Sequence, residues 1–113
     1  MKDDLIYLNH ILQSIIRIEE YLYNIKYDDY CSNLLLQDGI IRQLEIIGEA
    51  SKHLSEATII LKPNIPWKDI VGMRNKLTHD YFGTDIDNVW ETAKDDIPFI
   101  KPIIIELINI LEK

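Results

Sequence analysis

Residues 34–54 read Leu-Leu-Leu-Gln-Asp-Gly-Ile-Ile-Arg-Gln-Leu-Glu-Ile-Ile-Gly-Glu-Ala-Ser-Lys-His-Leu, the longest helical pattern in the chain. Apolar residues recur mainly at spacings of three and four, which places them on one face of a helix. Ser32 is a residue type that caps helix N-termini, and the pattern continues towards Ala57. The sequence therefore predicts a helix from Ser32 to about Ala57 with a stripe formed by Leu36, Ile40, Leu44, Ile47 and Leu54.

A second helical pattern precedes this stretch. Asp3 and Asp4 are suitable caps, and apolar residues then recur at three and four residues to about Asn24. The polar and aromatic run at residues 26–32 breaks the period, which predicts a connection between two helices. The predicted stripe consists of Leu5, Leu8, Ile11, Leu12, Ile15, Ile18 and Leu22.

The remainder of the chain predicts shorter helices. Pro66 suits the first turn of a third helix from about Trp67 to Phe82, and Gly83 suits its end. Asp85 and Asp87 are possible caps for a short fourth helix. The pair Asp96 and Pro98 predicts a new start for a fifth, with apolar positions Phe99, Ile103, Ile104, Leu107, Ile110 and Leu111.

The composition agrees with this pattern. Of 113 residues, 47% are hydrophobic and 27% charged, with only four Gly and four Pro. Such a chain favours helices joined by few turns, and its length suits one compact domain. We predict an all-α fold, a small antiparallel bundle of four to five helices, in a single domain at residues 1–113.

The net charge and the reactive side chains limit the classes of function that the sequence supports. The formal net charge is −7, which argues against a broad basic surface for long nucleic acids, so any phosphate binding must be local. Cys31 has no second Cys for a disulfide or thiolate metal site, and His10 and His53 lack partners at metal-ligand spacing. We expect no metal and no cofactor. The absence of a signal sequence or an apolar membrane span predicts a cytoplasmic protein.

The chemically distinctive segment is residues 73–83, Met-Arg-Asn-Lys-Leu-Thr-His-Asp-Tyr-Phe-Gly. It places Arg74, His79 and Tyr81 in the order R-x4-H-x-Y. A guanidinium can bind a phosphate through two parallel hydrogen bonds, and an imidazole can move a proton near neutral pH. Together they could cleave a phosphodiester without a metal.

One regular helix does not bring these three groups together, since His79 lies about 140° around the axis from Arg74. Two arrangements would solve this. The last helical turn could fray and reorient His79, or two subunits could share the site, with Arg74 of one facing His79 of the other. The second arrangement predicts a symmetric homodimer.

Several nearby polar residues allow two interpretations. Asp38, Arg42, Glu45 and Glu49 form one charged line, which is typical of a solvated helix face with ion pairs. Alternatively, Glu49 or Asp38 orients Arg74 or His79 across a dimer cleft. Asn75 is either an ordinary exposed helix residue or a hydrogen-bond partner of His79 or of an RNA phosphate, and these three residues are supporting candidates.

Two separated blocks resemble a known family. Residues 65–99 contain Ile-Pro-Trp-Lys-Asp-Ile-Val-Gly-Met-Arg-Asn-Lys-Leu-Thr-His-Asp-Tyr-Phe-Gly, followed by Val-Trp-Glu-Thr and Asp-Asp-Ile-Pro. Residues 36–50 contain Leu-Gln-Asp-Gly-Ile-Ile-Arg-Gln-Leu-Glu-Ile-Ile-Gly-Glu-Ala. Both blocks closely resemble the HepT-like proteins of the HEPN superfamily, and the resemblance covers nearly the whole chain.

The resemblance implies a homodimeric, all-helical ribonuclease toxin of a type VII toxin–antitoxin pair. It implies Arg74 and His79 as the catalytic pair, RNA as the substrate, and an MntA-like nucleotidyltransferase as the antitoxin. It also implies that the antitoxin transfers AMP from ATP to Tyr81. Two alternatives stay open: a catalytically silent HEPN binding module that acts by complex formation with a nucleotidyltransferase, and a plain scaffold domain in which the motif is structural.

Overall fold

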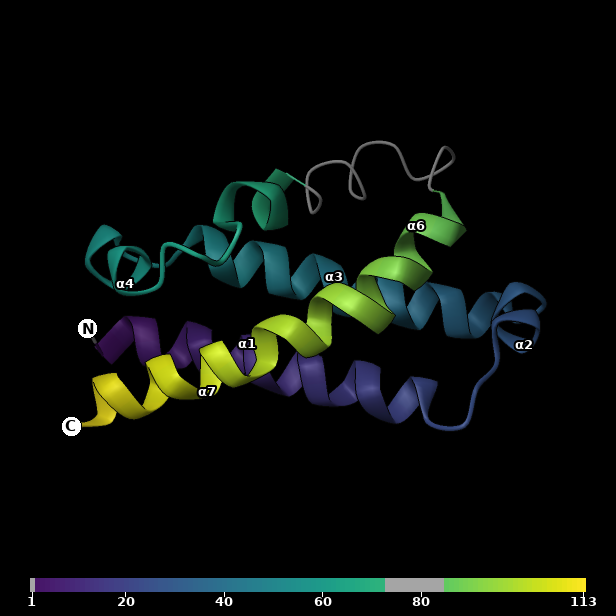
Figure 1. The fold of residues 1–113 in the computed structure, drawn as a ribbon, viewed down its shortest axis with the longest axis horizontal. Helices are drawn as coiled ribbons and strands as arrows, with labels where there is room; N and C mark the ends of the chain where they lie inside the picture. The colour runs from purple at the N-terminus through teal and green to yellow at the C-terminus, as the bar shows by residue number, and fades with distance from the viewer. Residues whose placement is uncertain (1, 73–84) are drawn as a thin grey trace.

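The computed structural model describes residues 2–72 and 85–113, which are mostly helical with no strand among them. Three long helices form the body: α1 (Lys2–Leu22), α3 (Leu34–Lys52) and α7 (Ile97–Glu112). Figure 1 shows α1 running away from the N-terminus, and α3 and α7 both returning towards that end. Both α3 and α7 pack against α1. The prediction of an all-α antiparallel bundle is confirmed.

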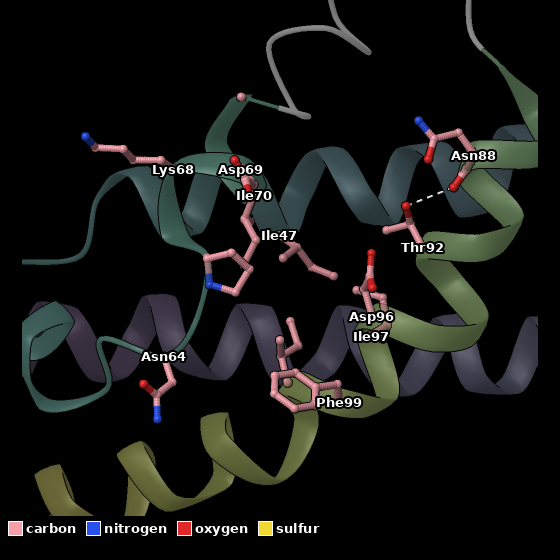
Figure 2. Close-up of a pocket in the computed structure, with 13 residues that line it drawn as sticks. Ile47, Asn64, Lys68, Asp69, Ile70, Asn88, Thr92, Asp96, Ile97 and Phe99 are labelled. Atoms are coloured by element: carbon pink, nitrogen blue, oxygen red, sulfur yellow. Dashed lines mark hydrogen bonds between the residues drawn. The ribbon is translucent and has the colours of Figure 1, made fainter.

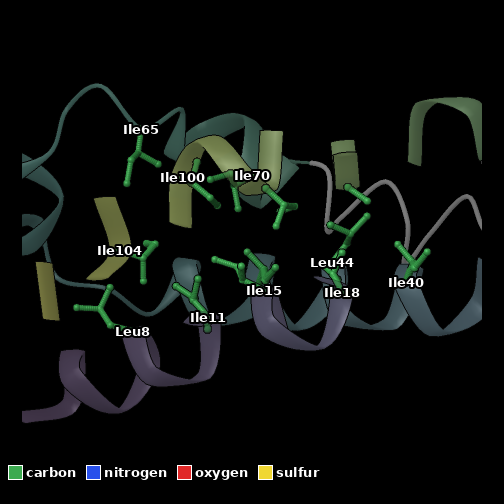
Figure 3. Close-up of a cluster of buried hydrophobic side chains, with 14 of the residues drawn as sticks. Leu8, Ile11, Ile15, Ile18, Ile40, Leu44, Ile65, Ile70, Ile100 and Ile104 are labelled. Atoms are coloured by element: carbon green, nitrogen blue, oxygen red, sulfur yellow. The ribbon is translucent and has the colours of Figure 1, made fainter. Parts of the chain in front are cut away.

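The core lies where the apolar stripes of these three helices meet (Figure 3). The alternation of Ile and Leu at three- and four-residue spacing gives each helix one buried face, and burial of that face is the main stabilising contribution to the fold. None of the described helices combines the length and hydrophobicity that a membrane span requires. Fully buried core side chains include Leu8, Ile11, Ile15, Ile40, Leu44, Ile104 and Leu107.

Short helices join the long ones and differ in part from the predicted set. The run at residues 26–32, predicted to be a break, contains α2 (Tyr27–Cys31), because the Tyr30 ring is fully buried and holds this turn against the bundle. The other short elements are α4 (Glu56–Leu61), the helical residues 67–72 and α6 (Ile86–Glu91). The described part therefore has more helices than the four to five that we predicted.

The predicted boundaries of the long second helix were wrong at both ends. Asn33, rather than Ser32, caps α3, and its side chain accepts a hydrogen bond from the Leu36 N–H at 3.0 Å. Ser32 instead donates to the Asp28 and Asp29 carbonyls at the end of α2. At the other end α3 stops at Lys52, and a new helix, α4, starts at the Ser55 cap.

The α4 cap is held by a buried carboxylate from the first turn of α1. Asp4 was predicted to cap α1, but its side chain accepts hydrogen bonds from the hydroxyls of Ser55 and Thr58, both at 2.5 Å. The Ser55 backbone N–H donates to the same carboxylate at 3.2 Å. Burial would raise the pKa of Asp4, but these hydrogen bonds outweigh it and lower the pKa below 3.8.

This arrangement predicts how acid and mutation affect stability. Because the pKa of Asp4 is lowered on folding, its ionised carboxylate stabilises the folded protein above pH 3.8. This stabilisation is lost as the pH falls below that value. We expect Asp4→Ala to lower the free energy of unfolding by ~1–3 kcal/mol near neutral pH, since two hydroxyls lose their acceptor. Urea unfolding at about pH 7 and about pH 3 measures this, and the difference between the two proteins should shrink in acid.

Asp3→Ala is the matched control, because Asp3 is the exposed neighbour of Asp4 on the same helix. The control should unfold at the urea concentration of the unsubstituted protein. Equal destabilisation by the two substitutions would contradict the role of the Asp4 carboxylate.

The predicted helix boundary at Asp96 is confirmed in position, since α7 begins at Ile97, but it is not a fresh start. The chain passes from α6 through one π-helical segment, η2 (Thr92–Asp96), directly into α7, and Asp96 makes no capping hydrogen bond. The Ile97 N–H donates to the Thr92 carbonyl five residues earlier, as in a π-helix. Pro98 lacks an N–H and would interrupt a regular ladder at this point, which accounts for the irregularity without a break in the helix.

Candidate functional site

The R-x4-H-x-Y motif lies outside the described residues. Arg74, Asn75, His79 and Tyr81 all fall between Gly72 and Asp85, so their predicted roles stay predictions. The structure does describe the two helical segments that precede and follow the motif. These segments define the scaffold on which the motif is mounted.

The preceding segment is fixed by a buried tryptophan. Trp67 is only 8% exposed, and its indole N–H donates to the Lys62 carbonyl at 3.1 Å. Ile65 and Ile70 are buried on either side of it and join the core beside Ile100 (Figure 3). Trp67 therefore anchors this segment in the core, and the helical residues 67–72 that lead to the motif are packed against the bundle.

The following segment is fixed by its cap and by two tyrosines. As predicted, Asp85 caps α6, accepting from the Asp87 and Asn88 N–H groups at 2.9 and 3.3 Å. The Tyr30 hydroxyl donates to the Ile86 carbonyl at 2.7 Å, and the Tyr27 hydroxyl donates to the Asp87 carboxylate. The motif therefore leaves and rejoins the scaffold at two anchored points.

Both tyrosines are held in their protonated, hydrogen-donating form. Burial raises the pKa of Tyr30 to about 12, and the hydrogen bond to Asp87 raises the pKa of Tyr27. Their rings also pack against Trp90, with ring centroids 4.9 and 5.6 Å away. The contact between α2 and α6 is thus aromatic as well as polar, which fixes the start of α6 firmly.

A cavity of about 710 Å³ opens beside the point where the described chain enters the motif. Figure 2 shows that residues 64–72 form one wall, that α6, η2 and the start of α7 form the other, and that Ile47 of α3 lies between them. Its apolar lining comes from Ile47, Pro66, Ile70, Ile97, Phe99 and Ile100. We call this the entry cavity.

The polar lining of the entry cavity is mostly acidic or neutral. Asp69 and Asp96 contribute carboxylates, Asn64 and Asn88 contribute amides, and Figure 2 shows the Lys68 side chain extending away from Asp96. The Thr92 hydroxyl donates a hydrogen bond to the Asn88 carbonyl at 2.8 Å. With two carboxylates and no inward cation among the described lining residues, the cavity alone is a poor phosphate site.

The charged line on α3 contributes to a different cavity. Arg42, Glu45 and Glu49 line a space of about 400 Å³ between α1 and α3, and the Glu49 carboxylate lies 3.3 Å from the His53 ring nitrogen. Asp38 is exposed near the start of α3. The predicted contacts of Glu49 or Asp38 with Arg74 or His79 lie outside the described residues.

The same space contains the two histidines for which the sequence showed no partner at metal-ligand spacing. His53 and His10 are exposed, but both lie against the ring of Tyr7, at centroid distances of 5.0 and 6.3 Å. Tyr7 and His10 are three residues apart on α1, a spacing that brings side chains together, whereas His53 is too far from Tyr7 in sequence for spacing to show the contact. Among the described residues, no group of three or more His, Cys, Asp or Glu side chains is arranged to hold a metal ion.

Comparison with known proteins places the chain in a family. The family described as Ribonuclease HepT-like matches residues 11–107. An all-helical domain with the R-x4-H-x-Y motif between two anchored helices is the architecture described above, and this chain belongs to the HepT-like ribonuclease family.

The relatives carry related names. The chain is 46% identical over 112 residues to a Methanocaldococcus jannaschii protein named "Gamma-glutamylcyclotransferase and putative RNase", covering 99% of this chain but only 50% of that protein. It is 44% identical to "Probable ribonuclease HepT" of Thermococcus cleftensis, covering 84% and 86% of the two chains. It is 38% identical to a "Putative RNase" of Caldanaerobacter subterraneus, covering 96% and 97%. No solved structure matches the chain.

Proposed function

We propose that this protein is a metal-independent endoribonuclease that uses Arg74 and His79 to cleave RNA. The observation that carries the proposal is the intact R-x4-H-x-Y motif in a chain of the HepT-like ribonuclease family. The relatives named as ribonucleases support the same reaction class. The residues on both sides of the motif are anchored to the bundle, which supports the proposal because a catalytic site requires a firmly packed scaffold.

The residue types fit cleavage by the neighbouring ribose. His79 would take the proton from a 2′-OH, whose oxygen then attacks the adjacent phosphorus as the bond to the 5′-oxygen breaks. The leaving 5′-oxygen takes its proton from water, so each site requires one imidazole and one guanidinium. Arg74 would neutralise the charge that develops on the phosphorus oxygens, and the product would end in a 2′,3′-cyclic phosphate.

We further propose that the active form is a homodimer. A regular helix separates Arg74 from His79 by about 140°, so a shared site is the simplest way to bring a guanidinium and an imidazole to one phosphate. Asn75, Glu49 and Asp38 would support the pair by hydrogen bonding or charge. A second copy would also double the number of cations at a site whose described surroundings are acidic.

The biological setting that we propose is a cytoplasmic toxin–antitoxin pair. An MntA-like nucleotidyltransferase would be the antitoxin, and it would transfer AMP from ATP to the Tyr81 hydroxyl. The transferred phosphate would lie seven residues from Arg74, on nearly the same helical face. Inhibition would then combine a competing charge with steric blocking of the cleft.

The direct test is RNA cleavage by the purified chain with EDTA present, in comparison with the Arg74→Ala, His79→Ala double variant.

A second candidate function is a catalytically silent module that binds a nucleotidyltransferase. The net charge of −7 and the carboxylates of Asp69 and Asp96 favour this candidate, since they oppose RNA binding. Metal-free cleavage that depends on His79 would exclude it.

A further inference from the structure

The entry cavity has a lining that suits one flat, neutral group carrying hydrogen-bond donors. Its volume of about 710 Å³ falls within the usual range for small-ligand sites, ~300–1,000 Å³. Ile47, Ile70 and Ile97 line it from three different segments of the chain but are themselves buried, and the exposed Pro66 adds accessible apolar surface. The ring of Phe99 lies at the edge and is 60% exposed, so it contributes little to the core and has a free face for stacking.

The polar side chains of the entry cavity determine which chemical class of ligand could bind. Neither Asp69 nor Asp96 has a hydrogen-bond or ion-pair partner among the described residues, and an ionised carboxylate only accepts hydrogen bonds. The cavity therefore opposes an anion and favours a cation or a neutral group with N–H donors, and RNA supplies the second of these. An unpaired nucleobase has a flat face for the apolar walls and polar groups along its edge.

The donor pattern discriminates among the bases. Adenine, cytosine and guanine each present an exocyclic amino group that can donate to a carboxylate. Uracil presents two carbonyl oxygens on either side of a single N–H, and these oxygens are repelled by a carboxylate. Asp96 is placed for this contact, because η2 brings it to the cavity together with Thr92 while Ala93 and Ile97 stay buried.

We propose that the entry cavity binds an unpaired, amino-bearing base of the RNA next to the cleaved phosphate, with Asp96 as the residue that discriminates against uracil and Phe99 as the stacking surface. This inference rests on the proposed ribonuclease function. It adds a specificity site built from described residues, in addition to the motif that performs the cleavage. It also explains how an acidic cavity can adjoin a phosphate-cleaving motif, because the base and the phosphate occupy different places.

The test uses four 2′-O-methyl tetranucleotides that carry A, C, G or U at one position among uridines. Blocking the 2′-OH prevents cleavage, so binding is measured separately from catalysis. NMR titration of the intact protein would follow the Asn64 and Asn88 side-chain amides and the Asp96 backbone amide. We expect the A, C or G oligonucleotides to bind about 5-fold or more tightly than the all-uridine one.

Two variants and a control make the test specific. Asp96→Asn supplies a donor as well as an acceptor. The ratio of the affinities for the amino-bearing and the all-uridine oligonucleotides should therefore fall close to one. Phe99→Leu should weaken binding of all four oligonucleotides by about 5-fold or more, through lost stacking. Asp95→Asn makes the same charge change at the adjacent, exposed residue that does not line the cavity, and it should keep the preference.

Equal affinity for the four oligonucleotides, shifts confined to residues outside the cavity, or equal effects of Asp96→Asn and Asp95→Asn would each overturn the proposal. These failures are distinguishable from failure of the ribonuclease function. A chain that cleaves RNA but shows no base preference lacks the base site alone. A chain that binds the blocked oligonucleotides selectively but never cleaves RNA lacks the catalytic function alone.

Discussion

Replacing Arg74 and His79 together by alanine is expected to lower the rate of RNA cleavage by about 10³-fold or more. A positioned acid or base contributes ~10²–10⁴-fold, and removal of one group that stabilises developing charge costs ~10²–10³-fold. The losses will not simply add, because the two groups act on the same transition state. Single-turnover cleavage of a labelled RNA in EDTA measures the rate, and the product ends identify the 2′,3′-cyclic phosphate.

The matched control removes the same residue types elsewhere. Arg17 and His10 are exposed on α1, and the Arg17→Ala, His10→Ala double variant should cleave at the rate of the unsubstituted protein. Arg74→Lys keeps the charge but loses the planar fork, so an intermediate rate is expected. Undiminished cleavage by the Arg74→Ala, His79→Ala protein, with its helical content intact, would contradict the assigned roles.

Transfer of AMP to Tyr81 is expected to reduce cleavage by about 100-fold, because a new phosphodiester would compete for Arg74 and the nucleoside would fill the cleft. The measured quantity is the ratio of cleavage rates before and after incubation with ATP and the cognate nucleotidyltransferase. Tyr81→Phe lacks the acceptor oxygen, so its ratio should stay near one. Mass spectrometry should find AMP on the peptide that contains Tyr81.

Tyr23 supplies the control for this modification. Its side chain is 76% exposed, so it is the most accessible of the described tyrosines, and accessibility alone would make it a better acceptor. Tyr23→Phe should remain fully sensitive to the nucleotidyltransferase. Loss of inhibition in Tyr23→Phe, or continued inhibition of Tyr81→Phe, would contradict the assignment of Tyr81 as the regulatory acceptor.

The long helices could be predicted from sequence because their information is local. Every residue of the predicted stripe from Leu8 to Leu22 is buried except Leu12, which is partly buried. The Asp85 cap was likewise visible from one residue type at the start of a helical pattern. In both cases the deciding interactions lie within one or two helical turns.

The errors arose where distant residues decide the local structure. Ser32 and Asn33 are both good caps, but Ser32 is engaged with the Asp28 and Asp29 carbonyls of α2, a turn that Tyr30 anchors through its hydrogen bond to the Ile86 carbonyl, 56 residues away. The separation of α3 from α4 depends on Asp4, which lies 51 residues before Ser55. No local pattern contains these contacts.

The candidate site divides in the same way. The motif was visible from sequence because its residue types and spacing stand together in eleven residues, although its geometry lies outside the described part of the chain. The entry cavity was not predicted. It is assembled from Ile47, from residues 64–72 and from residues 88–100, and its acidic wall depends on the π-helical segment, which Pro98 led us to interpret as a helix start.

The shared dimer site is tested most directly by mixing two inactive proteins, Arg74→Ala and His79→Ala. If each site takes Arg74 from one protomer and His79 from the other, a mixed dimer contains one site with both groups intact. After random exchange of protomers, half of the dimers are mixed, so about a quarter of the unsubstituted activity should return. A mixture that stays as inactive as either protein alone, although mass spectrometry shows mixed dimers, would contradict the shared site.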